Sequence, residues 1–319
     1  MLPFTNKRQT LVPFISSVLF IVLLSYVYWS HLASGDTLVH EHRTCVSAVS
    51  MEQAGRSTGT DKVLRHGYHR YVQPYLTLLC TLWEKRGETP ALLEIGINSG
   101  KSLGMWTASM PGWYVYGMDI SVRLEKPGLT VFQADQSSLD DIRKVFNSIS
   151  HPVPMINDDG SHIPEHQLLT FNFFFENLLQ PGGVYVLEDI ETSYWTGGSL
   201  YGYKTPFGFG HAKSAVEIFK KAADIVNREF LLPTSLDVLL KETGNCNNDE
   251  GVQTTRIKTG LQKGYCHGIW PRALGLISSV TFGKNLIIIT KKSASDQEYD
   301  RAWNEYPMLP WLSKDPSDA

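Results

Sequence analysis

Leu92-Leu93-Glu94-Ile95-Gly96-Ile97-Asn98-Ser99-Gly100 runs from an apolar segment into a glycine turn, about a third of the way along this 319-residue chain. The apolar residues 91–97 are typical of a buried strand, and the helical run 101–109 follows the turn. Glycines in such a turn let the backbone approach a ligand closely, and the amino end of a helix favours negative groups. The segment therefore predicts a strand–turn–helix unit with a ligand at the turn.

The segments that follow repeat this alternation of strands and helices. Further strands are expected at 113–118, 130–134, 153–156 and 184–187, and helices at 139–148, 164–179 and 211–230. Near the end, the expected strands 278–282 and 286–290 flank Gly283-Lys284-Asn285, a tight hairpin signal. The pattern predicts an α/β fold: a doubly wound, mostly parallel, Rossmann-like sheet of seven strands that ends in an antiparallel hairpin.

Composition excludes few classes of protein. The chain is 42% hydrophobic and 19% charged with a formal net charge of -3, which is typical of a globular protein and gives no basic surface for nucleic acid. Cys80 lies in an apolar helical run and reads as a buried thiol. Cys246 and Cys266 flank a polar segment that a disulfide could close, and the sequence leaves this pairing open.

An uncharged, mostly apolar run covers residues 11–29. As a helix it would span roughly 28 Å, close to the hydrocarbon thickness of a bilayer. Lys7 and Arg8 precede it, so the positive-inside rule places the first ten residues in the cytosol. We expect a single-pass signal anchor, with the rest of the chain in a lumen or outside the cell. A cleaved signal peptide is the alternative.

The expected organisation therefore has five parts. They are a cytosolic tail (1–10), a transmembrane anchor (11–29), a stem (30–55), a catalytic domain (56–295) with an irregular insertion (240–275), and a peripheral tail (296–319).

Two acidic clusters follow neighbouring expected strands. They are Asp158-Asp159-Gly160-Ser161-His162 and Glu188-Asp189-Ile190-Glu191. In an open parallel sheet, ligands bind outside the carboxyl ends of the strands, so both clusters should reach one rim. Carboxylates gathered there repel one another unless a cation lies between them, and oxygen ligands suit Mg²⁺, Mn²⁺ or Ca²⁺. The alternative is that these are solvated loop residues or helix caps.

Acidic residues also end the first three expected strands. Glu94 precedes the glycine turn, Asp119 is placed to accept hydrogen bonds from ribose hydroxyls, and Asp135-Gln136 could read an adenine edge. The turn lacks the Gly-x-Gly-x-x-Gly of NAD enzymes and the Lys-Ser/Thr of a P-loop, which favours S-adenosylmethionine as the nucleoside ligand. A tight turn without any ligand is the alternative.

These motifs resemble those of the macrocin and mycinamicin sugar O-methyltransferases, which are metal-dependent class I methyltransferases that use S-adenosylmethionine. The motifs that carry the resemblance are Gly59-Thr60-Asp61-Lys62, His66-Gly67-Tyr68, Leu93-Glu94-Ile95-Gly96, Asp135-Gln136-Ser137, 158–162 and 188–195. It covers residues 56–200 and the terminal hairpin. Residues 196–275 have no counterpart, so the sugar substrate does not carry over, and the membrane anchor is a further departure.

The resemblance implies a role for each site residue. Asp159, Glu188 and Asp189 would hold Mg²⁺ or Mn²⁺, and His162 would be the general base. The residues expected to bind the cofactor are Glu94, Gly96, Asn98, Ser99, Asp119, Asp135, Gln136 and Asp158.

The chemistry supports these roles independently. A divalent cation stabilises the alkoxide of a sugar hydroxyl, and a nearby imidazole can take its proton. His166 is expected to be structural, and Lys62 could cover the methionine end of the cofactor. Tyr194, Tyr201 and Tyr203, which lie among glycines, suit stacking on a sugar.

The sequence thus favours a membrane-anchored, Mg²⁺-dependent O-methyltransferase that acts on a hydroxyl of a sugar, glycan or glycosylated small molecule. A lumenal glycosyltransferase, which would use a metal and a nucleotide sugar, is the second hypothesis. A methyltransferase-like scaffold without activity is the third. The acceptor stays open, and a homo-oligomer is compatible with the sequence.

Overall fold

The structure, a computed structural model, describes residues 48–63, 69–84, 89–196, 205, 207–228, 231, 233–244 and 268–296. All of them belong to one compact unit, Val46–Ala319. The predicted membrane span at 11–29 lies outside the described residues, as do Cys246 and Cys266. Within the described ranges, no helix combines the length and the apolar character needed to cross a bilayer.

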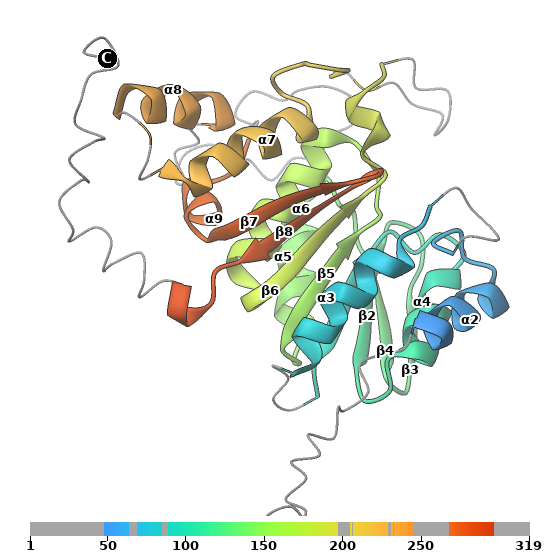
Figure 1. Ribbon diagram of the computed structural model, residues 1–319. Coiled ribbons are helices and arrows are strands. Elements are labelled where there is room, and N and C mark those ends of the chain that lie inside the picture. Colours follow the sequence, from blue (N-terminus) through green and yellow to red (C-terminus); the bar gives the residue numbers. More distant parts are fainter. Residues whose placement is uncertain are drawn as a thin grey trace, which may run out of the picture. The chain divides into compact units, whose positions relative to one another are not determined.

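The centre of the unit is an eight-stranded sheet in the order β3-β4-β2-β1-β5-β6-β8-β7 (Figure 1). Strands β4, β2, β1, β5 and β6 run parallel, whereas β8 is antiparallel to β6 and β7 is antiparallel to β8. The predicted doubly wound sheet with a terminal hairpin is therefore confirmed. The strands are β1 Ala91–Ile95, β2 Tyr114–Asp119, β3 Leu124–Lys126, β4 Leu129–Gln133, β5 Val153–Asp158, β6 Leu179–Glu188, β7 Ile277–Gly283 and β8 Leu286–Lys291.

The predicted number of seven strands is wrong, because β3 forms an eighth strand at the edge. It pairs antiparallel with β4 across Pro127-Gly128, where Gly128 has a φ of 76°. Three residues are too few to show alternation, so only the turn dipeptide could have revealed this strand. Strand β6 also begins at Leu179, before the predicted start at residue 184, and contains Pro181-Gly182-Gly183.

Helices cover both faces of the sheet. They are α2 Ala48–Thr58, α3 Val72–Glu84, α4 Lys101–Ser109, α5 Leu139–Ser148, α6 Pro164–Asn177, α7 Ala215–Val226, α8 Pro233–Gly244 and α9 Pro271–Gly275, with a short 3₁₀ helix η1 at Ile190–Ser193. Helix α2 begins inside the segment expected as a stem, and α8 and α9 overlap the expected insertion at 240–275. Cys80, on α3, is disulfide-bonded, so its interpretation as a buried thiol is wrong.

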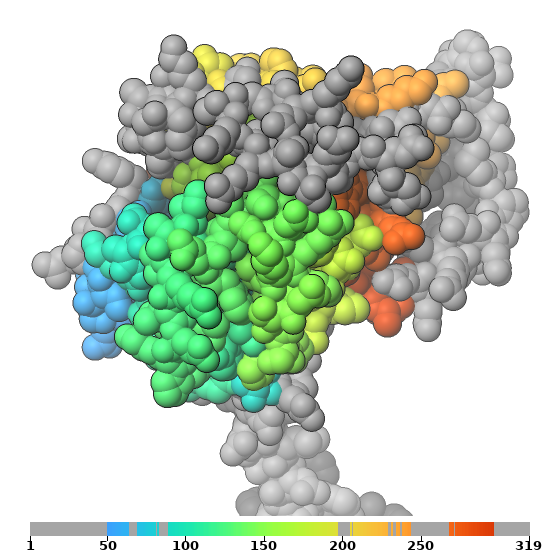
Figure 2. All heavy atoms as spheres, turned by 180° about the vertical axis from the view of Figure 1, so that it is seen from behind, coloured from blue at the N-terminus to red at the C-terminus, as the bar shows by residue number. Residues whose placement is uncertain are grey.

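Alternate residues of each strand feed two separate cores. On β1, Leu92 packs with the residues of α2, α3 and α4, whereas Leu93 packs with those of α5, α6 and α7. The central strands are buried on both faces, as expected for a parallel sheet. In Figure 1, α3 crosses one face of the sheet, while α5 and α6 lie on the other. Figure 2 shows this second side, where the green middle part of the chain forms a continuous surface.

The parallel strands end along one rim. Ile95 at the end of β1 pairs with Asp158 at the end of β5, and Asp158 pairs with Leu187 of β6. On the other side of β1, Ile95 pairs with Met118 of β2. The predicted site residues lie at the ends of the parallel strands or in the segments that follow them, so the topology brings them to one edge of the sheet.

Candidate active site

The glycine turn after β1 packs directly against the first acidic loop. Gly96 has a φ of 83°, and a Cβ atom built on it would lie 2.0 Å from the carbonyl oxygen of Asp159. The amide of Asp159 donates to the carbonyl of Ile95 at 2.9 Å. Only glycine fits between these two backbones, so residue 96 determines where Asp159 lies.

A cleft of about 620 Å³ opens at the rim, a size typical of small-molecule sites. Six of the eight predicted cofactor residues line it: Gly96, Asn98, Ser99, Asp119, Asp135 and Gln136. Asp159, His162 and Asp189 line it as well. Glu94, Asp158 and Glu188 are buried and are not part of the described lining.

Asp119 stabilises the glycine turn. Its Oδ2 accepts hydrogen bonds from the amides of Ile97 (2.9 Å) and Asn98 (3.1 Å), and its Oδ1 accepts from the amide and hydroxyl of Ser121. Burial alone would raise the pKa of Asp119, but these donors outweigh it and lower the pKa. The carboxylate thus stays charged at the rim, where the sequence predicts a ribose contact.

Asp158 and Gln136 form a structural network under the cleft. Gln136 Nε2 donates to both carboxylate oxygens of Asp158 (2.8 and 3.0 Å), and Thr170 and Tyr185 donate to its Oδ2. The side-chain oxygen of Gln136 accepts from the amide of Ser161 at 2.8 Å. Burial raises the pKa of Asp158 despite these donors. These two residues hold the first acidic loop in place.

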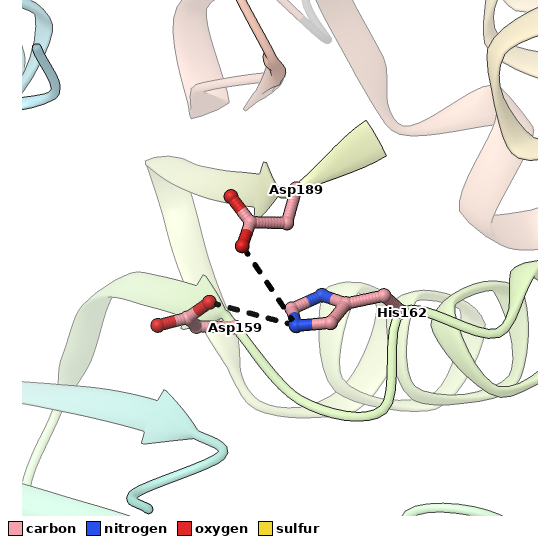
Figure 3. A group of neighbouring side chains, drawn as sticks. All are labelled: Asp159, His162 and Asp189. Carbon is pink, nitrogen blue, oxygen red and sulfur yellow. Dashed lines mark ion pairs between the residues drawn. The ribbon is translucent and has the colours of Figure 1, made fainter. Parts of the chain in front are cut away.

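Asp159, His162 and Asp189, which all line the cleft, converge on one another (Figure 3). His162 Nε2 lies 4.0 Å from Asp159 Oδ1 and 3.9 Å from Asp189 Oδ2. One potential ligand atom from each residue falls within 4.8 Å of the others, so the three could hold a metal ion. His162 and Asp189 have φ values of 56° and 52°, an uncommon backbone conformation for non-glycine residues that clusters at functional sites.

Asp189 is held from two distant parts of the chain. Tyr71 OH donates to its Oδ1 at 2.8 Å, and the Nδ2 group of Asn285 donates to the same oxygen at 3.1 Å. Asn285 lies in the β7–β8 turn with a φ of 60°, and its own side-chain oxygen accepts from the amide of Glu191. These bonds orient the second carboxylate of the site.

Glu188 is not a member of this trio, and its carboxylate contacts a buried lysine. Lys62 Nζ lies 2.7 Å from Glu188 Oε2, 2.5 Å from Asp159 Oδ2 and 3.6 Å from Glu94 Oε1. Tyr75 OH also donates to Glu188. Burial raises the pKa of Glu188 to about 7, although the Lys62 ammonium opposes the shift. Burial would lower the pKa of Lys62, but the three carboxylates raise it well above its usual value, so the lysine is charged.

Several of these residues were not predicted to belong to the site. Tyr71 and Tyr75 carry no sequence signal, Asn285 is predicted only as part of the hairpin turn, and Lys62 is predicted over the cofactor rather than among the carboxylates. Of the three tyrosines predicted to stack on a sugar, Tyr194 is 45% exposed. Its ring stacks on that of Phe209, which is 76% exposed. Tyr201 and Tyr203 lie outside the described residues.

No protein-family model matches the chain. Curated relatives include a rhamnosyl tetracenomycin-C 2'-O-methyltransferase of Streptomyces olivaceus, 35% identical over 146 residues, which are 43% of this chain and 36% of that protein. Demethylmacrocin O-methyltransferase of Streptomyces fradiae is 35% identical over 123 residues, which are 36% and 31% of the two chains. The chain is similar in sequence to sugar O-methyltransferases. It spans about a third of the length of these relatives.

The similarity extends to a solved structure. MycE methyltransferase from the mycinamycin biosynthetic pathway, in complex with Mg, SAH and mycinamycin VI, superposes with a TM-score of 0.58 over 84% of this chain and 57% of its own, at 20% identity. At that identity the match establishes the fold, which is the class I methyltransferase fold that the terminal hairpin predicts. The comparisons do not support the glycosyltransferase alternative.

Proposed function

We propose that this chain is a Mg²⁺-dependent O-methyltransferase that transfers a methyl group from S-adenosylmethionine to a hydroxyl of a sugar, glycan or glycosylated small molecule. The observation that carries the proposal is the convergence of Asp159, His162 and Asp189 in a cleft that the glycine turn also lines. The similarity to curated sugar O-methyltransferases supports the same reaction class.

The residues of the cleft fit a nucleoside. Asn98 and Ser99 lie at the amino end of α4, and the Asp119 and Asp135 carboxylates line the same cavity. Carboxylates at these strand ends suit ribose hydroxyls and an exocyclic amine. His166 also lines the cleft, and burial lowers its pKa to about 4, so its imidazole is neutral at physiological pH. A neutral ring can contact an adenine edge without a charge.

The acidic residues fit a hard divalent cation. Asp159 and Asp189 present oxygen atoms near one another, and Mg²⁺ or Mn²⁺ prefers such ligands. Glu188, the third predicted ligand, contacts Lys62, which also contacts Asp159. When bound, the cofactor would supply a methyl group on a sulfonium, and the cation would lower the pKa of the acceptor hydroxyl.

The chain's own residues would supply positioning and a base. His162 Nε2 lies about equally far from both carboxylates, so it is placed to accept the proton of a hydroxyl held between them. Tyr71 and Asn285 fix Asp189, and the backbone at Gly96 fixes Asp159. Alignment of nucleophile and methyl carbon supplies much of the rate of a methyl transfer, so this rigidity is useful.

Binding and turnover of matched variants test the proposal. Wild-type protein should bind S-adenosylmethionine and Mn²⁺ in calorimetry and methylate a member of a glycoside panel, as read by mass spectrometry. D159N and D189N should lose Mn²⁺ binding but keep cofactor binding, and H162Q should keep both yet lose transfer. Loss of Mn²⁺ binding in H162Q would make His162 a ligand rather than the base. Failure of the wild type to bind S-adenosylmethionine would refute the proposal.

The proposed location is a lumen or the cell exterior, behind an anchor at residues 11–29. The disulfide at Cys80 supports an oxidising compartment, since disulfides are rare in reducing cytosol. Protease protection of the catalytic domain in sealed microsomes would test this. Digestion without detergent would place the domain in the cytosol instead.

A further inference from the structure

Lys62 is a buried cation that the proposed reaction does not use. Its side chain is 1% exposed, and its ammonium lies among the carboxylates of Glu94, Asp159 and Glu188, which we call the acidic cup. Glu94 and Glu188 are as buried as the lysine, at 0% and 1% exposed. An ammonium has three N–H donors and no acceptor. Lys62 donates hydrogen bonds to Asp159 and Glu188, and Glu94 lies at ion-pair distance, 3.6 Å.

We propose that Lys62 is the resident cation of the acidic cup: its ammonium neutralises Glu94, Asp159 and Glu188 and holds their carboxylates in place. Asp159 connects the two parts of the site. Its Oδ2 contacts Lys62, whereas its Oδ1 faces His162. Lys62 thereby sets which oxygen of Asp159 is presented to the ion. The metal part of this inference rests on the proposed function.

Neutral donors in the cup do not replace the charge of Lys62. Ser102 donates to Glu94 at 2.7 Å, and the Tyr75 hydroxyl donates to Glu188. Hydroxyl groups satisfy lone pairs of these carboxyl groups but carry no positive charge to set against them. Removal of one partner from a buried ion pair is strongly destabilising, because it leaves uncompensated charge. Lys62 is therefore a positioning residue that acts through charge.

A divalent cation should be able to take over this charge. The cup adjoins the Asp159–His162–Asp189 trio through a shared carboxylate, so an ion bound to Asp159 would lie close to the position of the lost ammonium. Without Lys62, the folded protein should depend on that ion. Without the repulsion of Lys62, the ion should also bind at least about tenfold more tightly.

The experiment compares K62M with K62M/E188Q in the full chain. Thermal unfolding is measured in EDTA and in Mn²⁺, and Mn²⁺ affinity is measured by electron paramagnetic resonance. We expect K62M to melt well below wild type in EDTA and to gain more from Mn²⁺ than wild type does. The double variant removes one carboxylate along with the lysine, and should recover much of the loss in EDTA.

K291M is the matched control. Lys291 is also buried, but its ammonium contacts the carbonyls of Glu176 and Leu179 instead of carboxylates. K291M should lower the melting temperature by the same amount in EDTA and in Mn²⁺. A general effect of deleting a buried lysine would appear in both single variants, whereas an effect of charge in the cup appears only in K62M.

Several results would overturn the inference. K62M could melt like wild type in EDTA, or its Mn²⁺ affinity and Mn²⁺-dependent shift could be no larger than those of wild type. If K62M fails to fold in both conditions, the double variant decides: a folded K62M/E188Q supports the charge role, and an unfolded one refutes it. If the wild-type protein binds Mn²⁺ but not S-adenosylmethionine, the proposed function is refuted, but the role of Lys62 as the cation of the acidic cup still stands.

Discussion

Gly96→Ala should destabilise the fold and disturb the metal site together. The new methyl group would lie 2.0 Å from the Asp159 carbonyl oxygen and 2.6 Å from Gly160 Cα, both backbone atoms that cannot rotate away. A non-glycine residue in the left-handed region costs about 1–2 kcal/mol. Overpacking adds about 1–3 kcal/mol, so we expect a total loss of about 2–5 kcal/mol in the free energy of unfolding.

Gly112→Ala separates the two contributions. Gly112 has a φ of 82°, against 83° for Gly96, but a Cβ there would meet nothing within 4 Å. Urea unfolding of both variants in EDTA, followed by circular dichroism, should show the larger loss for Gly96→Ala. Mn²⁺ binding should weaken in Gly96→Ala alone, because its backbone clash displaces Asp159. Equal losses in the two variants would refute the claim that this contact positions the first acidic loop.

Three more perturbations test separate parts of the site. Asn285→Gly keeps the left-handed turn but removes the amide that orients Asp189, so Mn²⁺ affinity measured by calorimetry should fall about 10-fold or more. His166 has a folded pKa of about 4, below its unfolded value of 6.5, so the unfolded chain binds more protons between these values. Its contribution to stability is therefore complete above pH 6.5 and lost as the pH falls toward 4, by up to about 3 kcal/mol in urea titrations. Tyr185→Phe removes a 2.7 Å donor to buried Asp158 and should cost about 1–3 kcal/mol of unfolding free energy.

Each of these three predictions has an outcome that would contradict it. A normal Mn²⁺ affinity in Asn285→Gly would show that the other contacts of Asp189, such as those with Tyr71 and His69, are enough to orient it. A His166→Gln variant with the same acid-dependent loss as wild type would assign that loss to other groups. Wild-type stability in Tyr185→Phe would mean that the remaining donors satisfy the Asp158 carboxylate.

The parts of the fold that could be predicted are those with strong local signals. The buried parallel strands are nearly continuous apolar runs, and helix α5 has the predicted bounds Leu139–Ser148 because Ser138 caps it and its apolar residues recur at helical spacing. The three residues of β3 carry no such pattern. Local sequence therefore predicts the order of the elements but not the sheet's edge.

The residues of the site also differ in how far the sequence predicts them. The acidic motifs follow directly after predicted strands, so their convergence could be expected from topology. Lys62 meets Asp159 and Glu188 across 97 and 126 residues, and Tyr71 meets Asp189 across 118. Such contacts depend on how α2 and α3 pack over the sheet, which no local pattern encodes. The sequence thus predicts the acids of the site better than the groups that hold them.

The strand order has a consequence for synthesis of the protein. Strand β8 pairs with β6, although almost a hundred residues separate them along the chain. While the polypeptide emerges from the ribosome, the edge of β6, the strand that ends at Glu188, has not yet paired with β8. An unpaired strand edge can pair with other chains and cause aggregation. The turn that supplies Asn285 arrives at the same late moment. A nascent chain that stops short of residue 285 should therefore need chaperone protection and lack any competent metal centre.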